Sequence, residues 1–70
     1  MAIHLKIDKV GGTFRLRPRK ERRDIAYIER RVRKCGVYGE GWKLERAMDR
    51  ELVFVRGNER SAVQYEIVEA

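Results

Sequence analysis

The sequence predicts a small α+β domain in which one amphipathic helix packs on an antiparallel sheet, with elements in the order ββαβββ. Two observations support this fold class. Apolar and polar residues alternate in several short segments, whereas in one central segment the apolar residues recur every three or four positions. The chain has 70 residues, which suffices for one thin core, so we expect a single domain over residues 1–70.

The first two strands are expected to form a β-hairpin within residues 2–17. Apolar residues occupy every second position on either side of the glycine pair Gly11-Gly12: Ile3, Leu5, Ile7, Phe14 and Leu16. The glycine pair suits a tight turn, because such turns need positive φ angles. The other face of the hairpin would carry Lys6, Arg15 and Arg17.

A helix is expected to begin near Pro18 and to end before Gly36. Its apolar stripe is formed by residues at spacings of three, four and three: Ile25, Ile28, Val32 and Cys35. Pro18 suits a first helical turn, and Gly36 suits a left-handed C-terminal cap. The start is poorly signalled, because Arg17 is a weak N-cap and the residues after it are basic.

Three further strands are expected at residues 42–47, 52–56 and 61–69, separated by turns near residues 48–50 and 57–58. The continuous apolar run 52–55 favours a strand that is covered on both faces. Residues 42–48 also match a helical stripe, so a short second helix is the alternative there.

Charge is distributed unevenly along the chain, whose net charge is +6. Residues 1–35 hold 12 basic and 4 acidic side chains, and residues 36–70 hold 5 basic and 7 acidic ones. The run RLRPRKERR at residues 15–23 is the densest basic segment, and 12 of the 17 basic residues are arginine. Arginine grips phosphate or carboxylate with two parallel hydrogen bonds, so we expect an anionic partner.

The candidate binding residues lie on the hairpin and on the helix: Arg15, Arg17, Arg19, Arg22, Arg23, Tyr27, Arg30 and Lys34. A helix through the basic run would place Arg19, Arg23, Arg30 and Lys34 in one stripe opposite the apolar side, with Tyr27 available to stack on a base. The sequence therefore predicts a nucleic-acid-binding protein that contacts the phosphate backbone with little sequence specificity. DNA and RNA remain equally open.

Two alternatives accompany this prediction. The basic face can be an ordinary solvated surface, or it can bind an acidic protein, as in small regulators or inhibitors of the kind that mobile elements encode. Tyr38 and Trp42 flank a glycine-rich loop, where they form either the rim of the core or an aromatic protein interface. The edge strand within residues 2–7 would also allow a homodimer.

Several function classes are not expected. His4 and Cys35 stand alone, so no metal site, cofactor site or catalytic triad is predicted, and Cys35 is expected to be a buried apolar residue. The GxxG match at residues 36–39 is better explained by a helix cap at Gly36 than by an RNA-binding loop. The sequence contains no long apolar segment and no signal-peptide pattern, so we expect a cytoplasmic protein without a membrane partner.

Overall fold

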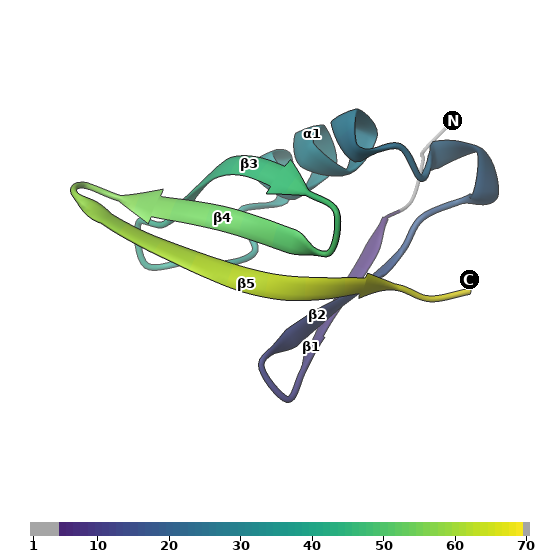
Figure 1. The fold of residues 1–70 in the computed structure, drawn as a ribbon, viewed down its shortest axis with the longest axis horizontal. Helices are drawn as coiled ribbons and strands as arrows, with labels where there is room; N and C mark the ends of the chain where they lie inside the picture. The colour runs from purple at the N-terminus through teal and green to yellow at the C-terminus, as the bar shows by residue number, and fades with distance from the viewer. Residues whose placement is uncertain (1–4, 70) are drawn as a thin grey trace.

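The computed structural model describes residues 5–69, in which a curved five-stranded sheet carries one helix on one face (Figure 1). Along the chain the elements are β1 (Lys6–Val10), β2 (Thr13–Arg17), the 3-10 turn η1 (Lys20–Arg22), α1 (Ile25–Cys35), β3 (Lys43–Met48), β4 (Glu51–Arg56) and β5 (Glu59–Ile67). The predicted ββαβββ order is confirmed. The prediction of a purely antiparallel sheet is wrong, because the strand order β1-β2-β5-β4-β3 includes one parallel pair.

The parallel pair joins β2 to the last three residues of β5. Phe14 lies opposite Tyr65, and Leu16 lies opposite Ile67. The first six residues of β5 pair instead with β4, on the other edge of the same strand. Parallel neighbours require a long crossover, and here it comprises everything from η1 to β4. The long strand β5 therefore joins the N-terminal hairpin to the rest of the sheet.

The N-terminal hairpin is confirmed, although it begins later than predicted. Gly11 and Gly12 have φ angles of 58° and 83°, the conformation that a tight two-residue hairpin turn requires. The first strand begins at Lys6, and the predicted strand residues Ile3 and His4 lie outside the described part of the chain.

The helix begins at Ile25 and not near Pro18, so this part of the prediction is wrong. Asp24 is the N-cap, and its carboxylate accepts a hydrogen bond of 3.0 Å from the backbone N–H of Tyr27. Pro18 is buried and precedes the short turn η1. The predicted C-terminus is confirmed: Gly36 is left-handed, with φ 59°, and its N–H bonds the Val32 carbonyl.

The inner face of α1 differs from the predicted stripe. Ile28 and Val32 are buried as expected, and Tyr27 joins them at 5% exposure. Ile25 is 43% exposed and Cys35 is also exposed, so the prediction of a buried cysteine is wrong. Both residues stand in the terminal turns of an 11-residue helix, where the sheet does not cover them.

The core lies between α1 and the sheet, and β4 runs through its centre. Leu52 and Phe54 are 0% and 1% exposed, whereas Val53 and Val55 on the opposite face are only partly covered. The expectation that β4 is covered on both faces is therefore met on one face only. Residues 43–48 form a strand with a bulge between Leu44 and Arg46, so the helical alternative for this segment is wrong.

Helix α1 covers the outer edge of β3 with two polar side chains. Glu29 Oε2 accepts a hydrogen bond of 2.9 Å from the N–H of Ala47. Arg33 donates to the carbonyls of Leu44 and Glu45 at 3.3 and 2.8 Å. The two side chains also form the i,i+4 ion pair that the spacing favours, at 3.8 Å. These side chains occupy backbone groups on the outer edge of β3 that could otherwise pair with another strand.

Strand β1 forms the other edge of the sheet, and Lys9 points to the same side as the core. Its ammonium lies 5.7 Å from the ring centre of Phe14 and 5.2 Å from that of Tyr38. A charged side chain on the inner face of an edge strand opposes pairing with a second chain. This position disfavours the homodimer that the sequence allows through β1.

Candidate nucleic-acid interface

The predicted binding residues lie on three separate parts of the fold. Arg15 and Arg17 belong to β2, and Arg30 and Lys34 belong to α1. Arg19, Arg22 and Arg23 lie in or beside η1, before the helix begins. The prediction of one helical stripe through Arg19, Arg23, Arg30 and Lys34 is therefore wrong, because residues 19–23 do not share the axis of α1.

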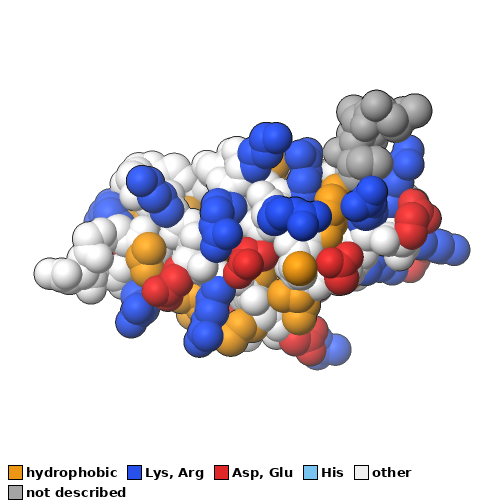
Figure 2. All heavy atoms as spheres, turned by 90° about the horizontal axis from the view of Figure 1, so that it is seen from above, with side chains coloured by type: hydrophobic (Ala, Val, Ile, Leu, Met, Phe, Trp, Pro, Cys, Tyr) orange, Lys and Arg blue, Asp and Glu red, His pale blue; other side chains and the backbone are white. Residues whose placement is uncertain are grey.

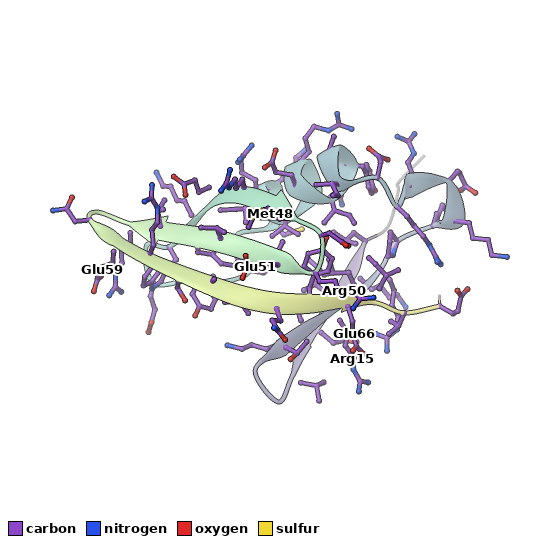
Figure 3. All side chains as sticks on the ribbon, viewed as in Figure 1. Arg15, Met48, Arg50, Glu51, Glu59 and Glu66 are labelled. Carbon is purple, nitrogen blue, oxygen red and sulfur yellow. The ribbon has the colours of Figure 1, made fainter. Side chains whose placement is uncertain are left out.

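Arg15 and Arg17 lie on the face of the sheet opposite α1, and both are ion-paired. The guanidinium of Arg15 lies 3.6 Å from Glu66, and the two side chains sit together below β5 in Figure 3. Arg17 forms a hydrogen-bonded ion pair with Asp8 on the neighbouring strand β1. The hairpin arginines therefore have much of their charge offset within the protein.

The segment around η1 holds basic side chains that differ in their surroundings. The N–H of Arg22 bonds the Arg19 carbonyl at 2.9 Å, which tightens the chain into a single turn. The guanidinium of Arg23 forms an ion pair with the carboxylate of Glu69 at 3.4 Å. Arg19, Lys20 and Arg22 are exposed, and within residues 5–69 no carboxylate pairs with them.

On α1, Arg30 and Lys34 stand one turn apart on the exposed side. Neither forms an ion pair with another described residue, whereas Arg33 between them is engaged with Glu29 and β3. We define the cationic surface as the predicted or neighbouring basic residues that lack a carboxylate partner in the described chain: Arg19, Lys20, Arg22, Arg30 and Lys34. Lys20 belongs to the predicted basic run but was not among the candidate residues.

Figure 2 looks onto the molecule from the side that carries α1. Lys and Arg side chains lie across this view, with Asp and Glu side chains and apolar patches between them. Two acids belong to the segment of the cationic surface itself. Asp24 is engaged as the helix cap, and Glu21 is exposed within η1. The surface is therefore predominantly basic without being purely so.

Tyr27 does not lie on the exposed side of α1, and the prediction that it is available for base stacking is wrong. Its side chain is 5% exposed, and the guanidinium of Arg22 lies 5.4 Å from its ring centre. The helix begins so late that Tyr27 falls in the first turn, where the η1 segment lies over it. The ring supports Arg22 and offers no open face.

Tyr38 and Trp42 form the rim of the core. The ring of Tyr38 stacks on Phe54 at 4.5 Å with an interplanar angle of 24°, and its hydroxyl lies 3.3 Å from Ser61 Oγ. Trp42 meets Tyr38 edge to face at 5.6 Å, and the guanidinium of Arg56 lies 4.7 Å from its ring centre. Both rings are half-buried.

A hollow of about 710 Å³ lies between the β3–β4 turn and the end of β5. It is lined by Thr13, Asp49, Arg50, Gln64, Tyr65, Glu66 and Ile67. Figure 3 shows Arg50 at the turn and Glu66 below β5. The two carboxylates outnumber the one guanidinium, so this hollow does not extend the cationic surface.

Protein-family models, curated proteins and solved structures yield no match to this chain. Residues 5–69 contain no cluster of three or more His, Cys, Asp and Glu side chains arranged to hold a metal ion. No helix in the same residues has the length and apolar character to cross a membrane.

Proposed function

We propose that this domain binds nucleic acid through the cationic surface, contacting the phosphate backbone with little sequence specificity. The observation that carries the proposal is the contrast between two sets of basic residues. Arg15 and Arg17 on β2 have carboxylate partners, whereas the five residues of the cationic surface have none among the described residues. A bound polyanion would supply the missing counter-charge.

Physical chemistry favours a phosphate ligand for such a surface. Each phosphate that a cation neutralises releases condensed counterions, so the logarithm of the affinity rises by about 0.9 for each tenfold fall in salt. Five exposed cations can therefore give substantial binding at low salt without contacts to base edges. Arg19 and Arg22 add the option of bidentate hydrogen bonds to phosphate oxygens.

Fluorescence anisotropy of labelled DNA and RNA over a series of salt concentrations tests the proposal. The test variants are Arg30→Gln/Lys34→Gln and Arg19→Gln/Lys20→Gln, which each remove two charges from the cationic surface. We expect each to weaken binding and to reduce the salt slope by about two, since each lost phosphate contact lowers it by roughly one.

A matched control removes the same charge from the opposite face of the sheet. Lys43 and Arg46 on β3 lie opposite Val55 and Val53, which face away from the core. The control Lys43→Gln/Arg46→Gln should leave the salt slope unchanged. Equal losses in control and test variants would mean that net charge alone, and not the cationic surface, governs binding.

The absence of binding at low salt, about 50 mM, would reject the proposal. An acidic protein would then be the partner to seek, by pull-down with the native domain and with Arg30→Gln/Lys34→Gln as the negative control.

A further inference from the structure

All six aromatic residues of the chain lie within the described part, and none presents an open ring on the cationic surface. Four are buried: Phe14 at 2%, Tyr27 at 5%, Phe54 at 1% and Tyr65 at 5% exposure. The other two, Tyr38 and Trp42, are half-buried and pack against the core. The aromatic side chains therefore serve the fold.

The two half-buried rings are also engaged by neighbouring side chains. Tyr38 stacks on Phe54 and has the Lys9 ammonium 5.2 Å from its centre. Trp42 has the Arg56 guanidinium at 4.7 Å, and Arg56 is held there by Glu59 and by the Glu40 carbonyl. On the ring faces that these cations cover, a nucleobase would have to displace them before it could stack.

Two of the five cations of the surface lie on the helix, and the other three lie in or beside η1. Arg30 and Lys34 are four residues apart on α1, which places them about 6 Å apart along the helix axis. Such a spacing suits an anion with regularly spaced charges. Double-stranded DNA carries one negative charge for about every 1.7 Å of its axis, and in any duplex the bases are already stacked on one another.

We infer that the ligand of the cationic surface is duplex nucleic acid, contacted at its backbone without base stacking; this inference rests on the proposed function. Proteins that bind single strands combine a basic groove with exposed aromatic side chains on which successive bases stack. This domain offers the charges without the rings. A duplex requires only the charges, and DNA and RNA duplexes share the chemistry that is needed.

Competing ligands of equal length test the inference by anisotropy. The ligands are oligothymidylate, a DNA duplex and an RNA duplex, each measured at the same salt concentrations. We expect at least one duplex to bind about tenfold or more tightly than oligothymidylate. Equal or tighter binding of oligothymidylate would overturn the inference and leave the proposed function standing. Failure of all three ligands to bind would reject both.

Trp42 provides an independent readout, because it is the one tryptophan of the chain. Its emission should stay unchanged when the protein is saturated with duplex, since the ring lies at the core rim and contacts no base. Quenching that follows the binding curve, together with weaker duplex binding by Trp42→Phe, would place the ring in the interface and overturn the inference. Circular dichroism checks whether Trp42→Phe is folded. If the variant does not fold, the emission of the native protein alone decides whether the ring lies in the interface.

Discussion

Glu29 and Arg33 stand one turn apart on α1, and each satisfies backbone groups of opposite kind on β3. Glu29 accepts from the Ala47 N–H, whereas Arg33 donates to the carbonyls of Leu44 and Glu45. The ion pair between them holds both side chains over the same edge. The helix thus contributes polar contacts to the sheet in addition to the apolar contacts of Ile28 and Val32.

Replacing Arg33 by methionine should destabilise the domain and expose this edge. Because two hydrogen bonds to carbonyls are lost, we expect the free energy of unfolding in urea to fall by about 1–2 kcal/mol. We also expect a greater tendency to self-associate in sedimentation experiments. Arg30→Met is the matched control, because it removes the same charge from a position that forms no hydrogen bond or ion pair with β3 among the described residues. We expect it to change stability by less than about 0.5 kcal/mol. Equal losses for the two variants would contradict a role for Arg33 at the edge.

Two tyrosine-to-phenylalanine substitutions should have different effects on stability. The Tyr65 hydroxyl donates a hydrogen bond of 2.7 Å to the Met48 carbonyl. Tyr65→Phe is therefore expected to lower the free energy of unfolding by about 1 kcal/mol. The buried Tyr27 hydroxyl has no hydrogen-bond partner among the described residues, so Tyr27→Phe should be neutral or stabilising. Thermal and urea unfolding measure both. A loss for Tyr27→Phe as large as that for Tyr65→Phe would disprove this distinction.

Stability should fall in alkaline solution as Tyr65 ionises. Burial raises the pKa of the Tyr65 hydroxyl above its ordinary value of 10.0, so the folded state favours the neutral phenol. This contribution is fully present below pH 10 and is lost as the pH rises through the folded-state pKa. Urea midpoints measured across this range should decline less steeply for Tyr65→Phe. Identical slopes for the two proteins would show that Tyr65 does not contribute.

The Cys35 thiol should react with a disulfide reagent while the domain is folded. Cys35 is exposed in the last turn of α1, next to the left-handed cap at Gly36. We expect labelling by Ellman's reagent at a rate within about tenfold of that in urea, because no unfolding is needed to reach the sulfur. Protection by several orders of magnitude would instead indicate the buried position that the apolar stripe of the sequence predicted.

The local elements of the fold could be predicted from the sequence because their signals are local. The Gly11-Gly12 turn, the Gly36 cap and the alternation in β5 each depend on neighbouring residues, and the structure confirms them. The helix start was missed although a signal existed. Asp24 is of a residue type preferred at the N-cap, and it directly precedes the segment whose apolar residues recur at helical spacing. The prediction instead used Pro18 and the basic run as the start, which lies too far upstream.

The mixed sheet and the division of the basic residues could not be predicted in the same way. The pairing of β2 with β5 depends on contacts between residues far apart in the sequence, for which no local pattern exists. The ion pairs Arg15–Glu66 and Arg23–Glu69 arise from that pairing, because it brings the end of β5 beside the N-terminal half. Which arginines keep an uncompensated charge was therefore a property of the tertiary fold.

The position of β5 has a consequence for how the chain folds during synthesis. Phe14 and Tyr65 are 51 positions apart, so the hairpin is synthesised well before its neighbour in the sheet. Until β5 emerges, one side of β2 and the inner edge of β4 lack their partners, and the core cannot close. Folding of such a topology is completed only when its most distant contact, between β2 and β5, has formed, as in other chains of high contact order. A nascent chain arrested before residue 59 is thus expected to remain sensitive to protease.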